Sequence, residues 1–336
     1  MSASGPPEMG EPDEFEQIAR LYRPLTQGSP EALGLLDDVA VLPSRPGFDL
    51  VITTDAMVAG VHFLPDEALD LVSRKLLRAN LSDLAAKAAE PHGYLLTVAW
   101  PLNIGFKARS QFAAGLAQDQ VSFGVRLLGG DTVSTSGPLT ASMTLLGWTP
   151  AGHVVRRDGA QVGDVVVVSG TIGDACLGLQ VLTGGLAELT RAQREELQDR
   201  HRLPMPRLAL QDALRRYASA AADVSDGLLA DACHIGEASG LGVSIRLDRL
   251  PLSAPARAWL ASQPDPSAAR LALATGGDDY EVVCAIPPGY VDAFTEAAAL
   301  SGTTVTAVGE VCQGAGLSAS FRGHAVAVGR RGWSHA

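Results

Sequence analysis

The sequence has few lysines, few aromatic residues and no long apolar run. Only three of its 26 basic residues are lysines, and 37 acidic residues give a formal net charge of −11. Clustered positive charge is what binds a nucleic-acid backbone, so nucleic acid is not expected as a partner. No apolar run approaches the roughly 18 residues of a membrane span, so no membrane segment is expected.

Cysteine is also scarce. The four cysteines include no CxxC pair and no histidine at the spacing of a zinc site; they are Cys176, Cys233, Cys284 and Cys312. They are expected to be buried thiols in a reducing compartment. The acidic N-terminus lacks the basic start and apolar core of a signal peptide, so we expect a cytoplasmic protein.

The common nucleotide-binding and hydrolase motifs are missing. The sequence contains no GxxxxGK[ST], no HExxH, no GxSxG and no GxGxxG that opens a helix. P-loop, zincin, α/β-hydrolase and Rossmann functions therefore lose their main support. A phosphoryl-transfer enzyme with this sequence would need a different fold.

The length of 336 residues, 46% of them hydrophobic, is enough for two domains with a sizeable core. Residues 1–13 are rich in Gly, Pro, Ser and acid and are expected to form a disordered leader. The polar segment 149–163 is the candidate boundary. We therefore predict an N-terminal domain at 14–150, which holds metal and ATP, and a C-terminal domain at 151–336.

Hydrophobic periodicity predicts alternating helices and strands in both halves. In the N-terminal half, helices are expected at 14–22, 69–89 and 107–123, and strands at 50–54, 94–100, 125–128 and 139–148. In the C-terminal half, helices are expected at 174–182, 191–201, from 207, at 228–239 and at 290–300, and strands at 165–169, 242–247, 280–286 and 303–311. This alternation indicates an α/β or α+β fold.

The most informative pattern is a set of aspartates at the ends of apolar segments. The clusters are Asp37-Asp38, Thr53-Thr54-Asp55, Asn80 to Asp83, Gly129-Gly130-Asp131, Asp223 to Asp226, and Gly276 to Asp279. Any one of them alone is more simply a turn or a helix cap. Asp83 is different, because it lies inside a helical pattern, where aspartate is disfavoured.

If these clusters converge, repulsion between carboxylates raises their pKa values unless cations enter. Mg²⁺ takes oxygen ligands and is commonly shared with phosphate, so a polyphosphate ligand is expected. Gly129-Gly130 would let backbone N–H groups approach phosphate, although a tight turn explains the pair equally well. Gly170 to Gly173 could hold an anion, but a plain connection between strand and helix is the commoner explanation.

In this order, the clusters resemble the thiamine-monophosphate kinase family, whose superfamily also contains aminoimidazole ribonucleotide synthetase and selenophosphate synthetase. The segments that carry the resemblance are LDDVAVL (36–42), TTDAMVAGVHF (53–63), NLSDLAA (80–86), LGGDT (128–132), RRDGAQVGD (156–164), SGTIGDACLGL (169–179), DVSDGL (223–228) and GGDDYEV (276–282). The resemblance implies a two-domain aminoimidazole ribonucleotide synthetase-like fold with the active site in the cleft.

The resemblance also implies a reaction: ATP phosphorylates thiamine monophosphate to thiamine diphosphate with several Mg²⁺ ions, by direct in-line transfer with no protein nucleophile, in a homodimer. The implied metal ligands are Asp38, Thr53, Thr54, Asp55, Asp83, Asp131, Asp223 and Asp226. The implied ATP contacts are Gly130, Asp131, Arg157 and Ser225, and the implied substrate contacts are His62, Asp278 and Trp333.

Three positions depart from the family pattern. Leu36 stands before the first acidic pair, where glycine is usual. The segment after Asp83 ends Lys87-Ala88-Ala89 in place of Met-Gly-Ala, which affects the expected end of the helix. Asp278 replaces a glutamate and shortens a substrate contact by one methylene.

Two alternatives remain at this point. Another ATP-dependent synthetase of the superfamily would share the acidic clusters, although a selenophosphate synthetase is expected to have a reactive Cys or selenocysteine near its N-terminus, and the first cysteine here is Cys176. A non-catalytic protein that binds divalent cations could use the same carboxylates.

Overall fold

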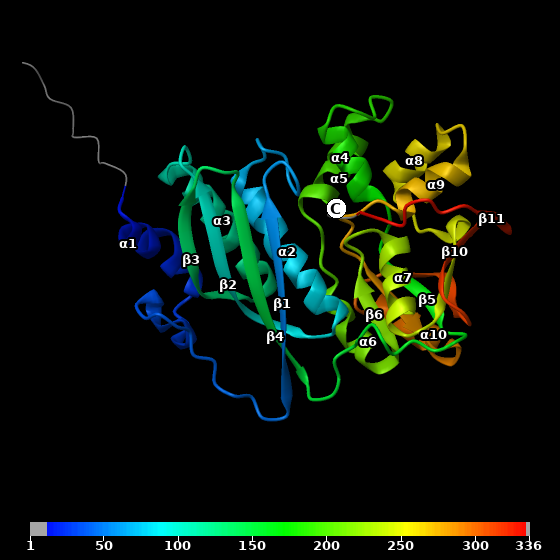
Figure 1. Cartoon of the computed structure of the whole chain (residues 1–336), viewed down its shortest axis with the longest axis horizontal. Helices are drawn as coiled ribbons and strands as arrows, with labels where there is room; N and C mark the ends of the chain where they lie inside the picture. Colours follow the sequence, from blue (N-terminus) through cyan, green and yellow to red (C-terminus); the bar gives the residue numbers. More distant parts are fainter. Residues whose placement is uncertain (1–11, 334–336) are drawn as a thin grey trace, which may run out of the picture. The chain divides into compact units, whose positions relative to one another are not determined.

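The structure is a computed structural model in which residues 12–333 are described (Figure 1). In this range the chain forms two compact units, which are 12–45, 54–77 and 91–146, and 46–53, 78–90 and 147–333. The predicted leader at 1–13 lies outside the described residues, apart from Pro12 and Asp13. None of the helices in the described part of the chain is both long enough and apolar enough for a membrane span.

Four long strands form the first sheet, in the order β1-β4-β2-β3. The strands are β1 (Phe48–Val58), β2 (Glu90–Pro101), β3 (Arg126–Thr135) and β4 (Thr140–Pro150). Helices α2 (Leu69–Ala86) and α3 (Phe106–Phe123) lie on one face of this sheet (Figure 1). Trp100 of β2 meets Phe112 of α3 edge to face, with ring centroids 5.4 Å apart, and both side chains are fully buried. Aromatic burial of this kind fixes the helix against the strands.

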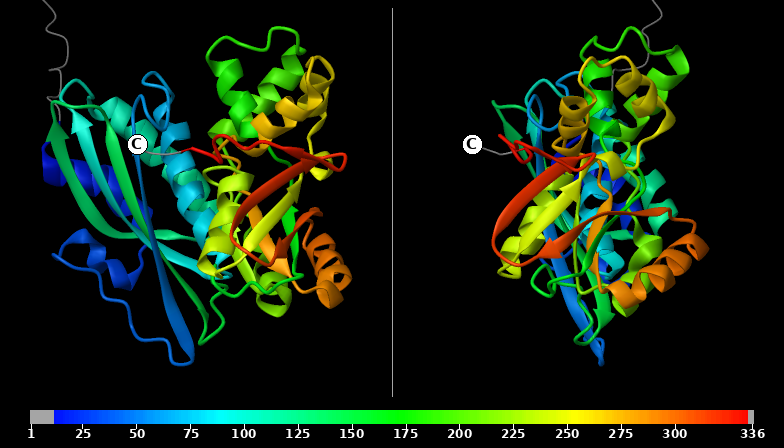
Figure 2. Two further views of the ribbon diagram at one scale, coloured as in Figure 1. Left: turned by 45° about the vertical axis from the view of Figure 1, so that its right-hand side comes forward. Right: turned by 90° about the vertical axis from the view of Figure 1, so that its right-hand side faces the viewer.

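Seven strands form the second sheet, in the order β11-β10-β7-β9-β5-β8-β6. They are β5 (Val165–Ser169), β6 (Ala220–Asp223), β7 (Gly242–Arg246), β8 (Val282–Ile286), β9 (Val305–Cys312), β10 (Gly316–Phe321) and β11 (His324–Val326). The red C-terminal strands β10 and β11 lie at one edge of the sheet (Figure 2). The apolar strand β5 pairs antiparallel with β8 and β9, which places its valines in the core.

The remaining helices begin with α1 (Glu14–Gln17), which Asp13 caps and which continues as wider turns over Ile18–Tyr22. The helices of the second unit are α4 (Asp174–Leu182), α5 (Arg191–Arg202), α6 (Gln211–Tyr217), α7 (Leu228–Ala238), α8 (Ala254–Ala261), α9 (Pro266–Ala274) and α10 (Val291–Leu300). The predicted α/β (α+β) class is confirmed. Helices α8 and α9 and strands β6, β10 and β11 were missing from the sequence prediction, because short elements carry little periodicity.

Several predicted element ends are wrong: β1 and β2 are longer than predicted, and two further differences lie next to motif residues. Gly129, Gly130 and Asp131 lie inside β3, which continues well past the predicted end at residue 128. Helix α2 ends at Ala86, three residues before the predicted end, and Pro91 lies within β2 instead of closing the helix. The prediction failed because a glycine pair, as in β3, and a proline near the start of a strand, as in β2, look like turns or breaks from the sequence alone.

The end of α2 has a clear physical cause. The backbone N–H of Lys87 still donates to the carbonyl of Asp83, but Ala88 has φ +55° and Ala89 donates to Leu84. A left-handed residue is how many helices end, and glycine adopts that conformation most easily. Alanine at this position ends the helix at a cost of about 1–2 kcal/mol.

Candidate active site

Three oxygen-bearing side chains of the second unit meet at the end of α2. The Thr53 hydroxyl of β1 donates to the Asp83 carboxylate, with 2.5 Å between Oγ1 and Oδ2. Asp223, at the end of β6, is buried and hydrogen-bonded to Asp83. Two carboxyl groups this close favour a shared proton or a bound cation between them.

The pKa of Asp83 is raised, as expected for a carboxyl group in such a cluster. Burial raises the pKa of Asp83, while hydrogen bonds from Thr53 and Asp223 and the charges of Lys87 and Arg157 act in the opposite direction. Burial makes the ionised form of an aspartate unfavourable, and a bound cation stabilises that ionised form. The predicted convergence of carboxylates is therefore present for Asp83 and Asp223.

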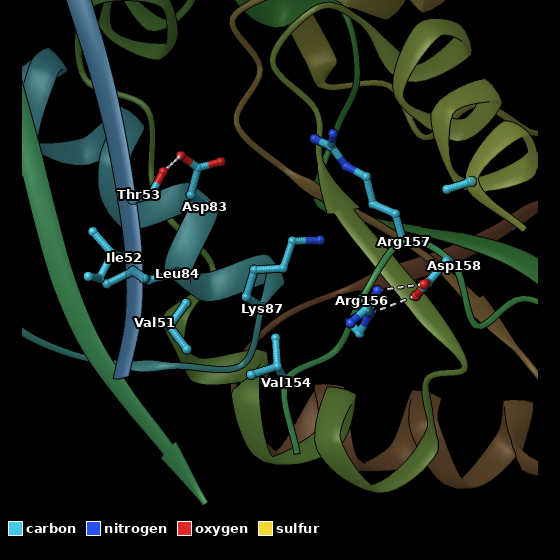
Figure 3. A pocket seen from close by; sticks show the side chains of 11 residues that line it. Val51, Ile52, Thr53, Asp83, Leu84, Lys87, Val154, Arg156, Arg157 and Asp158 are labelled. Carbon is cyan, nitrogen blue, oxygen red and sulfur yellow. Dashed lines mark hydrogen bonds and ion pairs between the residues drawn. The ribbon is translucent and has the colours of Figure 1, made fainter. Parts of the chain in front are cut away.

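A pocket of about 490 Å³ opens beside this cluster (Figure 3). One side of it is apolar and the other is charged: the lining residues are Val51, Ile52, Thr53, Asp83, Leu84, Lys87, Val154, Arg156, Arg157, Asp158 and Ala238. Arg156 is paired with Asp158, with 2.7 Å between Nη2 and Oδ2. An apolar wall opposite basic side chains suits a ligand that has both a flat ring and phosphate groups.

The loop that follows β6 is held by an aspartate that the sequence analysis did not single out. Asp231 of α7 accepts hydrogen bonds from the backbone N–H groups of Ser225, Asp226 and Gly227, each at 3.1 Å from Oδ2. Burial raises the pKa of Asp231 to about 7, and the charge of Asp226 acts in the same direction. The sequence did not point to it, because Asp231 lies in the first turn of α7, where an acidic residue is common.

Two further motif segments pack on this loop. Asp278 and Tyr280 donate their backbone N–H groups to the carbonyls of Ser225 and Val224, both at 2.8 Å. A Cβ on Gly277 would lie 2.6 Å from the Ser225 carbonyl oxygen, so glycine is what permits this approach. The Asp278 carboxylate lies 3.7 Å from Nδ1 of the buried His201.

The C-terminal segment reaches the same loop. The Trp333 N–H donates to the Asp226 carbonyl at 2.9 Å, and a Cβ on Gly332 would lie 2.5 Å from that carbonyl. The indole is half exposed, and the Arg330 guanidinium lies over it at 5.6 Å from the ring centroid. The structure thus brings Ser225, Asp226, Asp278 and Trp333 together on one loop, and their roles in binding stay a prediction.

The connection from Gly170 to Gly173 is already satisfied within the chain. The N–H groups of Gly173 and Ala175 donate to the buried carboxylate of Asp279, at 2.6 and 3.1 Å. With these donors used at the start of α4, the plain connection between strand and helix is favoured over an anion site.

The predicted site residues of the first unit are more dispersed. Asp38 is exposed and follows the turns at Pro30–Leu35, and Asp131 is exposed in β3. Asp55 lies on β1, and β1 and β3 form opposite edges of their sheet, three strand spacings or about 14 Å apart. The structure therefore does not bring Asp55 and Asp131 side by side, and their shared metal role stays a prediction.

Thr54 and Gly130 have contacts that explain their identity. The Thr54 hydroxyl donates to the Met143 carbonyl at 3.1 Å and lies 3.1 Å from the Thr144 hydroxyl. Because side chains alternate along a strand, Thr54 faces away from the side on which Thr53 meets Asp83. A Cβ on Gly130 would lie 1.8 Å from the Leu96 carbonyl, so this glycine permits close strand pairing and does not form a tight turn.

His62 is fixed by its own turn. Its Nδ1 accepts a hydrogen bond from the backbone N–H of Val58 at 3.0 Å, and Lys75 donates to its carbonyl at 3.3 Å. Since Nδ1 accepts, the neutral ring carries its proton on Nε2. The predicted substrate role of His62 is not tested by these contacts.

Comparisons with known proteins identify the family of the chain. Residues 36–149 match the family described as AIR synthase related protein, N-terminal domain, and residues 161–322 match its C-terminal domain. A thiamine-monophosphate kinase of Caulobacter vibrioides is 57% identical over 329 residues, which cover 98% of this chain and 92% of that protein.

Solved structures lead to the same family. The thiamine-monophosphate kinase from Stenotrophomonas maltophilia has a TM-score of 0.81 at 36% identity, over 93% of this chain and 98% of that one. A structure described as AaThiL complexed with AMPPCP and TMP has a TM-score of 0.76 at 29% identity, over 87% of this chain and 89% of that one. The chain therefore belongs to the thiamine-monophosphate kinase family of AIR synthase related proteins.

Proposed function

We propose that the chain transfers the terminal phosphoryl group of ATP directly to the phosphate of thiamine monophosphate, and so forms thiamine diphosphate and ADP. By family it is a thiamine-monophosphate kinase. The observation that carries the proposed mechanism is the cluster of Thr53, Asp83 and Asp223 at the rim of a pocket with basic side chains. Both reactants are anions, so the barrier is mainly repulsion and positioning.

The residues of this cluster fit Mg²⁺. A hydroxyl and two carboxyl groups form an all-oxygen donor set, and Asp83 is held in a state that a cation would relieve. Bound there, Mg²⁺ would neutralise phosphate charge as the phosphoryl group moves. We propose that Thr53, Asp83 and Asp223 hold such an ion, and that Asp38, Thr54, Asp55, Asp131 and Asp226 supply the other metal ligands.

Three of the four thiols are unsuited to a covalent intermediate. Burial raises the pKa of Cys176 and Cys284 far above neutrality and that of Cys233 to about 11, so all three stay protonated. Thiols react as thiolates, so these cannot accept a phosphoryl group at neutral pH. Cys233 and Cys284 are buried as predicted, whereas Cys176 and Cys312 are half-buried.

Nucleotide and substrate are assigned to different parts of the site. We propose that Gly130, Asp131, Arg157 and Ser225 contact ATP, and the pocket beside Arg157 supports this because it is basic on one side and apolar on the other. We propose that His62, Asp278 and Trp333 contact thiamine monophosphate. One solved relative is described as complexed with AMPPCP and TMP, an ATP analogue and this substrate.

Trp333→Ala is expected to act on one substrate only. The indole already lies beside a cation, the Arg330 guanidinium, and the thiazolium ring of thiamine is a permanent cation. A cation–π contact of about 0.5–2 kcal/mol predicts a three- to thirtyfold rise in KM for thiamine monophosphate. The KM for ATP should stay within about twofold, and Trp333→Phe should recover part of the loss. Steady-state kinetics with each substrate varied in turn tests this; unchanged KM values with a lower melting temperature would show a packing role.

The reaction itself is tested with ATP labelled at its γ-phosphate. We expect ADP release only when thiamine monophosphate is present, label in thiamine diphosphate and no label on the protein. A non-catalytic cation-binding protein would release no ADP. Stable label on the chain in the absence of the second substrate would contradict direct transfer.

Two further expectations belong to the same proposal. A homodimer would cover apolar side chains of the first sheet that are exposed in one chain, among them Val133 (46%) and Leu95 (39%). Sedimentation velocity measures the oligomeric state directly. We also propose a cytoplasmic location, in keeping with four free thiols.

A further inference from the structure

Lys87 lies among the carboxylates of the cluster, and neither the motifs nor the comparisons give it a role. It follows α2 directly, and its N–H donates to the Asp83 carbonyl at 3.0 Å, so the helical turn continues through it. Residues four apart on a helical turn point to the same side. Figure 3 shows its side chain extending from the end of α2 between Asp83 and Arg157.

The ammonium group is anchored on the strand that carries Asp223. Its Nζ donates to the carbonyl of Ala221 in β6, at 2.5 Å. Lys87 therefore joins the helix that supplies Asp83 to the strand that supplies Asp223. An ammonium has three donors, so the anchor leaves it able to interact with both carboxylates.

Three carboxylates of this region favour the charged form of the Lys87 amine; they are Asp223, Asp83 and Asp158. The other basic side chains of the pocket are arranged differently, because Arg156 is paired with Asp158 and Arg157 is exposed.

We propose that Lys87 is a resident cation of the metal site, which balances the charge of Asp83 and Asp223 and thereby weakens the binding of a divalent ion there. The inference rests on the metal cluster of the proposed function. A fixed positive charge stabilises the two carboxylates when no metal is bound, but it repels an ion that enters. With Lys87 in place, we expect the metal ion to bind mainly as a complex with the nucleotide. The negative charge of the phosphates then outweighs the repulsion between Lys87 and the ion.

Lys87→Met removes the charge and keeps an unbranched side chain of similar length. Mg²⁺ and Mn²⁺ binding without nucleotide, measured by titration calorimetry, should tighten about tenfold, since a neighbouring charge commonly shifts carboxylate equilibria by a factor of ten or more. Lys87→Arg should bind metal like the wild type. The exposed Lys107, replaced by Met, is the matched control and should change nothing.

Two further variants make the test decisive. Lys87→Gln is neutral but can still donate to Ala221, so it should also tighten metal binding even if Lys87→Met folds poorly. In the background of Asp83→Asn, Lys87→Met should have little effect, because the affected site is gone. Unchanged or weaker metal binding in a folded Lys87→Gln protein overturns the inference.

The outcome is separable from the proposed function. Wild-type turnover of thiamine monophosphate combined with unchanged metal affinity in the Lys87 variants would reject the resident cation alone. Tighter metal binding in those variants, with no turnover by the wild type, would reject the kinase assignment alone.

Discussion

Asp83→Asn should lower kcat by about 100-fold or more, since even residues that only support metal ligands commonly cost 10- to 100-fold. The amide keeps the shape of the side chain and can still accept from Thr53, but it brings no negative charge to a metal ion. Burial already raises the pKa of Asp83, so removing its charge removes an unfavourable buried charge from the metal-free protein. The variant should therefore melt at or above the wild-type temperature in EDTA, and Mg²⁺ should raise that temperature less than it does in the wild type.

Asp119→Asn is the matched control on another helix. Asp119 is also buried, and its Oδ1 lies 3.0 Å from Nε of Arg74. Losing this charge leaves Arg74 without its ionic partner, so stability should fall while kcat is kept. If Asp83→Asn instead lost stability in EDTA and kept its turnover, Asp83 would be a structural residue.

Glu281→Ala should lower the free energy of unfolding by about 3–5 kcal/mol, the usual effect of removing one partner of a buried ion pair. The Glu281 side chain is 1% exposed and accepts from Arg207, from Arg200 at 2.8 Å and from the Ser169 hydroxyl at 2.5 Å. Truncation would leave two guanidinium groups facing an emptied, largely buried position. Urea unfolding of wild type and variant measures the difference.

The Glu281 contribution should also depend on pH. Burial acts to raise the pKa of Glu281, but Arg207 and Arg200 outweigh it and hold the pKa below the ordinary 4.5. A lowered folded pKa stabilises the protein above the unfolded value and ceases to do so as pH falls through the folded value. The difference between wild type and Glu281→Ala should therefore be full at pH 7 and shrink below about pH 4.5.

Glu195→Ala is the surface control. Glu195 pairs with Arg191 one helical turn away at 2.7 Å, but both side chains are more than half exposed. Such a pair is screened by water, so no measurable loss of stability is expected. Equal losses at Glu195 and Glu281 would show that burial does not set the strength of these pairs.

The sequence by itself determined the fold class, most of the elements and the family. The helices at 107–123 and 174–182 and the strand at 165–169 were predicted within a residue of where they lie, since their apolar spacing and terminal glycines are local signals. The order of the aspartate clusters was enough to identify the family, because ordered motifs need no knowledge of contacts. Asp83 was singled out from the sequence because an aspartate inside a helix is locally unfavourable, and the structure places it beside Asp223.

Only the tertiary structure decided which of these residues meet. Asp83 and Asp223 are far apart in the sequence and come together because α2 ends beside β6, whereas Asp55 and Asp131 lie at opposite edges of one sheet. The sequence also did not indicate that Asp231 accepts hydrogen bonds from the loop after β6. Nor did it indicate that the Lys87 amine is anchored on β6. Local patterns specify helices and strands through backbone preference and burial, but strand order and helix docking depend on packing between distant segments, which no local pattern encodes.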